Sequence, residues 1–216
     1  MRAMRMFVRP EWRPAEDDCL QLIEANPWAL LISNGDSLPW ATNLPLLLDR
    51  SRGPKGTLVG HIARANAHAG ILQNSSLPSL AIFHGPYSYV TASWYPNRDM
   101  PSTYYYTAIH CQGRMAFQDD MSLEHWLEVL NNRMEANYEN GWKLSEVPEY
   151  DIKRRLKHIL GFEMQIEHLE GKFKLGQDEP KKDAMAVSRK LAHSADPGHR
   201  ELSEMIRRYN IDRSES

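Results

Sequence analysis

Apolar and polar positions along the chain predict many short β-strands joined by turns, with helices between some of them. Apolar runs or alternating patterns bounded by turn residues indicate strands at 28–33, 38–48, 57–62, 80–83, 104–117 and 161–169. Apolar residues at helical spacing indicate helices at 14–26, 67–72, 122–138, 149–159 and 181–192. A lysine- and glycine-containing segment, 171–180, is expected to be a loop.

The order of these elements predicts a mainly β, α+β protein: an antiparallel β-barrel with helices packed outside. Asn34-Gly35-Asp36 is a strong hairpin signal between the first two strands. Pro45 lies inside the second strand and lacks a backbone N–H, so it indicates a sheet edge or a bulge. A break at 194–198 separates a domain over 1–192, with helical insertions, from a tail over 193–216 that is expected to be helical or partly disordered.

Composition narrows the class of protein. Charged residues make up 25% and hydrophobic residues 42% of the 216 positions, as in ordinary globular proteins. The net charge of −2 argues against a broad nucleic-acid surface. Cys19 and Cys111 form no CxxC pair, which favours neither a zinc site nor a disulfide framework. No apolar run reaches the roughly 18 residues of a membrane span, and the start shows no secretory signal, so a cytoplasmic protein is predicted.

The strongest chemical signal is the segment 60–68, in which a strand is followed by a small-residue turn and the start of a helix. Unpaired N–H groups and the positive end of the helix dipole attract anions there. Arg64 adds a guanidinium that suits a phosphate. The simpler interpretation is an ordinary turn in which Asn66 only caps the helix.

Two further regions combine polar and aromatic residues. Thr42 and Asn43 interrupt the second strand next to Pro45, which is typical of a bulge near a site or of an edge strand without a ligand. The aromatic residues at 94–95 and 104–106 flank a polar loop. They are consistent with stacking on a planar ligand, with a protein interface, or with core packing.

The remaining sequence features argue against a metal site and a DNA-binding motif, and they assign no further function. Gly171-Lys172-Phe173-Lys174 offers lysines to an anion, although a solvated loop is the simpler interpretation for Lys172. Nine histidines show no metal-ligand spacing, and we predict no metal site and no catalytic side chain. The basic run at 153–157 lacks a helix-turn-helix partner, so no motif supports direct DNA binding.

Four segments together resemble the PaiB-like family, bacterial proteins often labelled FMN-binding negative transcriptional regulators. They are GHIARANAH at 60–68, SYVTASWYP at 88–96, PSTYYYTAIHCQGRM at 101–115 and GFEMQIEHLEGKFKLGQ at 161–177. The resemblance extends from about residue 4 to about residue 192. That family is similar in fold to the FMN-binding split β-barrels, so the resemblance implies this barrel with FMN as cofactor.

The resemblance also implies how FMN is held in a homodimer. The phosphate would lie at 60–68, the second strand would line the edge of the flavin ring, and aromatic residues would reach it from the second subunit. The candidate cofactor-binding residues are Thr42, Asn43, Leu44, His61, Ala63, Arg64, Asn66, His68, Trp94, Tyr95, Thr103, Tyr104, Tyr106, Lys174 and Gln177. Tyr104-Tyr105 replaces the Trp-Asn pair common in the family, which removes one amide from the flavin edge.

Three functional classes remain open from the sequence. One is an FMN-dependent oxidoreductase that acts on a small substrate, with the flavin carrying the hydride chemistry. Another is a transcriptional regulator of the protease and sporulation type that senses flavin or a metabolite. The third is an interaction dimer that has lost its ligand. Separately, haem is an alternative cofactor, since some split barrels bind haem.

Overall fold

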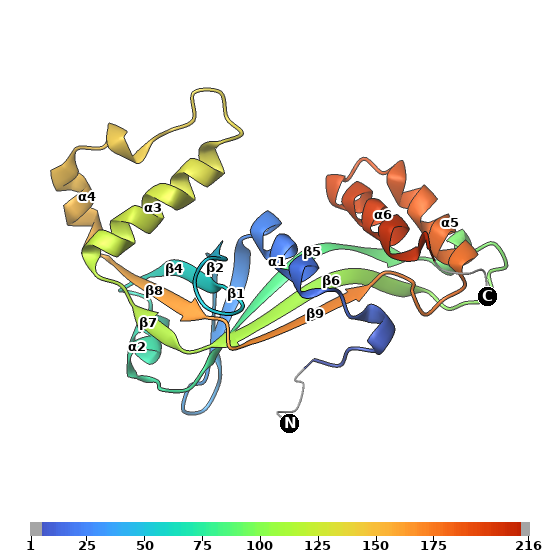
Figure 1. Ribbon diagram of the computed structural model, residues 1–216, viewed down its shortest axis with the longest axis horizontal. Coiled ribbons are helices and arrows are strands. Elements are labelled where there is room, and N and C mark those ends of the chain that lie inside the picture. The colour runs from blue at the N-terminus through green and yellow to red at the C-terminus, as the bar shows by residue number, and fades with distance from the viewer. Residues whose placement is uncertain (1–5, 213–216) are drawn as a thin grey trace. The chain divides into compact units, whose positions relative to one another are not determined.

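A computed structural model describes residues 6–212 (Figure 1). Residues 1–5, in the segment expected to lack a secretory signal, and 213–216, at the end of the predicted tail, lie outside the described part. The strands are β1 (Trp28–Ser33), β2 (Trp40–Pro45), β3 (Leu47–Asp49), β4 (Thr57–Ala63), β5 (Ser79–Val90), β6 (Thr103–Gly113), β7 (Met115–Phe117), β8 (Ile159–Gln165) and β9 (His168–Lys174). The α-helices are α1 (Glu16–Ala25), α2 (Ala67–Asn74), α3 (Asp120–Glu135), α4 (Glu149–Leu156), α5 (Lys181–Ala192) and α6 (Pro197–Asn210).

The strands form two sheets, ordered β2-β1-β5-β6-β9 and β3-β4-β8-β7. Antiparallel pairing joins β1 to β2 and to β5 in the first sheet. In the second sheet it joins β3 to β4, β4 to β8 and β7 to β8. Consecutive strands change sheets at β2–β3, β4–β5, β6–β7 and β8–β9. This arrangement confirms the predicted antiparallel α+β class with helices added to the sheets.

The change of sheet after β2 explains the proline in the second predicted strand. β2 ends at Pro45, and the N–H of Leu46 donates to the carbonyl of Pro27 at 2.8 Å before β3 begins at Leu47. Pro45 therefore stands at the end of the strand, where a missing donor costs little. The single strand expected at 38–48 is two strands in different sheets.

The chain divides into two compact units. We call residues 23–83 and 110–169 the central unit, and residues 6–22, 84–109 and 170–212 the terminal unit. The long strands β5 and β6 contribute residues to both.

The central unit has a core of large apolar side chains from its strands. The fully buried ones include Leu31, Leu58, Phe83, Phe162 and Met164. Helices α3 and α4 lie beside each other in Figure 1 and share a smaller cluster around Leu123, Ile152 and Leu156. These helices are the insertion that the sequence predicts between β7 and β8.

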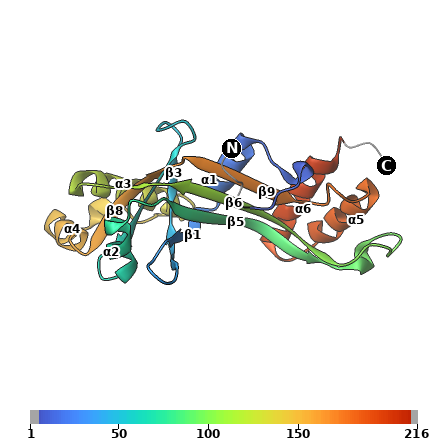
Figure 2. The same cartoon turned by 90° about the horizontal axis from the view of Figure 1, so that it is seen from below.

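In the terminal unit, α5 and α6 pack together, and β6 and β9 are neighbouring strands (Figure 2). Val187, Leu202 and Ile206 are buried, and the hydroxyl groups of Ser188 and Ser203 lie 3.0 Å apart. Helix α6 lies in the segment expected to be helical or partly disordered. The boundary at residue 192 stays a prediction.

The predicted and observed limits of the helices and strands agree best where turn or capping residues mark them in the sequence. Helix α5 and strand β1 have the predicted limits, and α1 and β4 begin or end within two residues of them. The strand expected at 80–83 is longer at both ends and extends from Ser79 to Val90. The expected loop at 171–180 is wrong for its first four residues, because Gly171–Lys174 completes β9.

Among residues 6–212, no helix combines the length and the apolar composition needed to cross a bilayer.

Candidate functional site

In the central unit, the turn between β4 and α2 has the geometry predicted from residues 60–68. Asn66 adopts an extended conformation and caps α2, with its side-chain Oδ1 accepting the N–H of His68 at 3.0 Å. The N–H of Asn66 donates to the carbonyl of Ala63 at 2.9 Å, which closes the turn. The start of α2 therefore faces the end of β4 across a short turn of small residues.

A network of neutral side chains ties this turn to β2. Thr42 Oγ1 lies 2.8 Å from His68 Nδ1 and 3.4 Å from Asn66 Nδ2. The ring of Trp40 stacks on His68 with centroids 6.3 Å apart. The sequence predicted all of these residues except Trp40 as cofactor contacts, and it did not predict that they contact one another.

His68 is the buried polar group of this network. Its side chain is fully buried, and Nε2 has no hydrogen-bond partner among residues 6–212. Burial lowers the pKa of His68, so the ring is neutral near pH 7. Since a buried polar atom without a partner is costly, this nitrogen is suited to a ligand atom.

Arg64 is exposed and lies next to the network. Among the described residues no carboxylate lies within ion-pair distance of its guanidinium. Its backbone N–H donates to the carbonyl of His158 at 2.9 Å, directly after the Ala63–Ile159 pair of the β4–β8 ladder. His158, which lies between α4 and β8, is therefore opposite Arg64. No sequence signal indicated this pairing.

These features fit a phosphate group. An unneutralised guanidinium, a capped helix start and an unpartnered imidazole nitrogen each favour an anionic oxygen ligand. The backbone N–H of Ala65, in the turn itself, also lacks a partner within residues 6–212. The chemistry of this set is hydrogen bonding to an anion without proton transfer.

Other predicted residues of the central unit have different surroundings. Asn43 and Ala63 are exposed, whereas Leu44 is buried in the core. His61 lies in a groove between β4 and α3 with Val59, Leu123, Trp126 and other apolar residues, and burial lowers its pKa. No contact joins His61 to Asn66 or His68 in the described chain.

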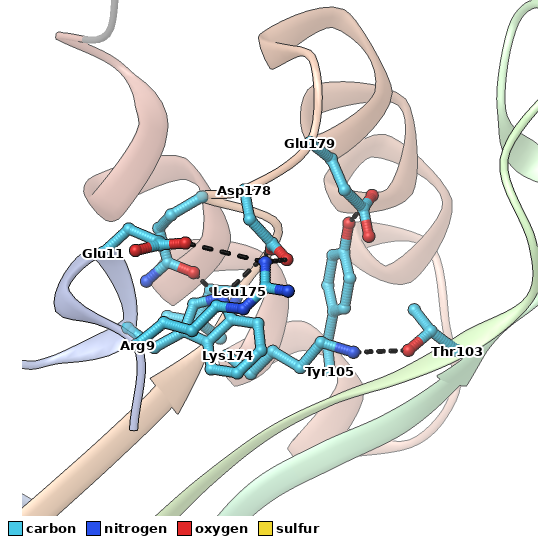
Figure 3. Close-up of polar contacts among 10 residues, drawn as sticks. Arg9, Glu11, Thr103, Tyr105, Lys174, Leu175, Asp178 and Glu179 are labelled. Atoms are coloured by element: carbon cyan, nitrogen blue, oxygen red, sulfur yellow. Dashed lines mark hydrogen bonds and ion pairs between the residues drawn. The ribbon is translucent and has the colours of Figure 1, made fainter. Parts of the chain in front are cut away.

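In the terminal unit, predicted residues lie on adjacent strands. Lys174 Nζ on β9 donates to Thr103 Oγ1 on β6 (Figure 3). Tyr104 is 54% exposed and meets Tyr89 edge-on, with centroids 5.5 Å apart. These tyrosines present aromatic faces on the open side of the sheet.

Lys172 and Lys174 contact an aromatic group that the sequence did not predict. Lys172 Nζ lies 4.9, 5.3 and 5.6 Å from the ring centroids of Trp12, Tyr106 and Phe7. Lys174 Nζ lies 5.6 Å from the Trp12 ring. We call these five residues the lysine–aromatic cluster; Lys172 is half-buried in a strand and is not a solvated loop residue.

Three other predicted residues have internal roles in the terminal unit. Gln177 is buried, and its amide donates to the carbonyl of Phe173 and accepts the N–H of Leu175, both at 2.7 Å. Tyr95 is 2% exposed, and its hydroxyl has no hydrogen-bond partner within the described chain. Trp94 is half-buried in the short 3₁₀ helix η2 (Ala92–Trp94).

Buried acidic residues accompany Tyr95. The hydroxyl of Tyr105 donates to Glu179 (Figure 3), and both residues are almost fully buried. Burial raises the pKa of Glu179, and burial also raises the pKa of Asp183. Burial and the Glu179 carboxylate raise the pKa of Tyr105, so its hydroxyl remains the donor. No sequence signal indicated this pairing.

No group of three or more histidine, cysteine or acidic side chains within 6–212 is arranged to hold a metal ion.

Comparison with known proteins assigns the chain to a family. Residues 6–168 match the family model described as "Putative FMN-binding domain". The chain is 23% identical over 190 residues to the Protease synthase and sporulation protein PAI 2 of Bacillus subtilis, which covers 88% of this chain and 90% of that protein. The predicted resemblance is thereby confirmed.

Solved structures agree on the fold. The FAD and haem binding protein of Mycobacterium smegmatis has a TM-score of 0.57 at 16% identity, covering 75% of this chain and 72% of that one. The flavocytochrome Anf3 of Azotobacter vinelandii has a TM-score of 0.54 at 12% identity, covering 81% and 75%. The predicted split-barrel architecture is confirmed by these likenesses.

Proposed function

Because the chain belongs to this family of FMN-binding domains, FMN is its cofactor, and we propose that the β4–α2 turn binds the FMN phosphate. The observation that carries this proposal is Arg64, whose exposed guanidinium has no carboxylate partner in the described chain and which shares the β4–α2 turn segment with His68, whose Nε2 is unpartnered there. A charge-assisted contact of this kind is worth roughly 1.5–3 kcal/mol.

The neighbouring side chains have distinct tasks in this proposal. Arg64 binds the phosphate oxygens, and neutral His68 offers its buried nitrogen. Thr42 orients that ring through its contact with Nδ1, and Asn66 holds the Thr42 hydroxyl and the backbone N–H of His68. Thr42, Asn43 and the backbone at Leu44 would line the edge of the flavin ring. Bound FMN would supply hydride or electron transfer, and the protein would bind and orient it.

We further propose a homodimer in which the second copy contributes terminal-unit residues to the flavin. Support comes from Tyr104 and Tyr89, whose exposed aromatic faces would be covered by another chain. Aromatic side chains with a polar tip are enriched at interfaces. Thr103 and Tyr106 lie on the same strand as Tyr104.

The reaction proposed is flavin-mediated hydride transfer between a nicotinamide and a small substrate. The reduced nicotinamide is the donor when the substrate is reduced, and the oxidised nicotinamide is the acceptor when the substrate is oxidised. A regulatory role in protease synthesis and sporulation is the second candidate, because the B. subtilis relative carries that name and aligns over most of both chains. Haem remains a candidate ligand, because both structural relatives are named as flavin and haem proteins or flavocytochromes.

Titration of the purified protein with FMN and with riboflavin tests the phosphate site. We expect FMN to bind at least tenfold more tightly than riboflavin, because only FMN offers a phosphate to Arg64. Flavin fluorescence and the visible absorption spectrum report binding of both ligands. Equal affinity for the two flavins would contradict the phosphate site, and no binding of either would contradict the flavoprotein.

A further inference from the structure

The lysine–aromatic cluster holds two positively charged side chains against aromatic rings. Alternate residues of a strand point to the same side, so Lys172 and Lys174 share one face of β9. Both ammonium groups lie against Trp12, at 4.9 and 5.6 Å from its ring centroid. Aromatic rings hold a cation in place but leave its charge and its N–H donors available.

The nearby carboxylates are engaged by other groups. Asp178 accepts the Trp12 indole N–H at 3.0 Å and an Arg9 N–H at 3.3 Å. Glu179 accepts the Tyr105 hydroxyl, and Glu170 accepts the Met6 N–H at 3.1 Å. Within residues 6–212 no carboxylate forms an ion pair with Lys172 or Lys174. Glu179 still interacts electrostatically with Lys174. The half-buried ammonium group of Lys172 is therefore the one that most favours an anionic ligand.

We propose that Lys172 and Lys174 form a second anion site that binds a diphosphate ester other than the flavin. This inference rests on the proposed function, because FMN has a single phosphate and that group is assigned to Arg64. Two ammonium groups on one strand face match the two phosphates of such a ligand. Trp12 is the positioning residue for both lysines.

The test compares ADP with adenosine, because the two differ only in the diphosphate. Binding is measured by calorimetry on the purified, FMN-loaded protein and on the K172M/K174M double variant. Methionine keeps the apolar stem against Trp12 and removes the charge. We expect the unmodified protein to bind ADP at least tenfold more tightly than adenosine, and the double variant to lose that preference.

The Arg64→Ala variant is the matched control, because it tests whether the lysine site is distinct from the FMN phosphate site. We expect it to lose FMN affinity and to keep the preference for ADP. The inference is overturned if the unmodified protein binds ADP no more tightly than adenosine, or if the double variant keeps the preference. It is also overturned if the double variant loses FMN instead, which would assign the lysines to the flavin phosphate. FMN binding by the unmodified protein is measured separately, and its absence would contradict the proposed function instead.

Discussion

The two proposed anion sites, one in each unit, would bind their ligands by different physical means. In the central unit, the neutral side chains of Thr42, Asn66 and His68 contact one another, and Arg64 in the same turn segment exposes its guanidinium. In the terminal unit, two ammonium groups are held against aromatic rings, and buried acids lie close to the same strands. The first site would select its ligand by directed hydrogen bonds, and the second by net charge. A mutation in the first should therefore change hydrogen-bond geometry, and a mutation in the second should change the local charge.

The largest expected effect is on the stability of the terminal unit. Tyr105 is fully buried on β6, donates to Glu179 and packs against Gly176. We expect Tyr105→Ala to lower the free energy of unfolding by about 3–5 kcal/mol, because a large cavity and an unpaired acid remain. Urea denaturation followed by circular dichroism measures the loss.

Tyr104→Ala is the matched control, since Tyr104 is the adjacent residue on the exposed side of β6. Its removal should cost about 0.5 kcal/mol or less. Similar losses for the two variants would show that the burial pattern of β6 is wrong.

The second prediction concerns the central unit and ligand affinity. Arg64→Ala should weaken FMN binding about tenfold or more and leave riboflavin affinity unchanged, because it removes a contact to the phosphate alone. Arg154→Ala is a suitable control, since Arg154 is exposed and already pairs with Asp151. Fluorescence titration measures both flavins. A parallel loss of riboflavin affinity would mean that Arg64 contacts the ring or supports the fold.

Local sequence patterns were sufficient where neighbours along the chain decide the structure. The N-cap at Asn66, helix α5 and strand β1 depend on contacts within a few residues, and all three were predictable. Strand β9 was not, because its lysines are held by Trp12, which lies far away in the sequence. Charge and glycine content indicated a loop there, and tertiary pairing with β6 overrides that preference.

The same distinction applies to the candidate site. Arg64, Asn66 and His68 are close in sequence and were predicted together. Their link to Thr42 depends on the pairing of β2, and the opposition of Arg64 and His158 depends on the β4–β8 register. Tyr105 and Glu179 are 74 residues apart, so no motif could connect them.

A third prediction separates the structural and the binding roles of Asn66. Asn66→Ala should cost about 1 kcal/mol of stability through loss of the cap on α2. Asn66→Asp keeps a capping oxygen but adds a negative charge beside the phosphate position. We expect it to retain stability and to bind FMN more weakly, with riboflavin unaffected. If Asn66→Asp binds FMN as well as the unmodified protein, the phosphate does not approach the start of α2.

The smallest expected effect is the opposite pH dependence of the two units. Burial lowers the pKa of His68, so the unfolded chain takes up a proton first, and stability falls as the pH drops below about 6.5. Burial raises the pKa of Glu179, so stability falls as the pH rises from about 4.3 through the raised value. Acidification therefore opposes the fold at His68 and favours it at Glu179.

Urea denaturation at pH 7.5 and at about pH 4.5 of the unmodified protein, His68→Gln and Glu179→Gln tests this opposition. The quantity compared is the loss of unfolding free energy between the two pH values. His68→Gln should reduce the loss of unfolding free energy, because it removes the imidazole whose protonation opposes folding. Glu179→Gln should increase that loss, because it removes the carboxyl group whose protonation favours folding. Each change should be a fraction of the roughly 1.4 kcal/mol that one pKa unit represents. Changes of the same sign in both variants would mean that the two units do not differ in the way their buried groups titrate.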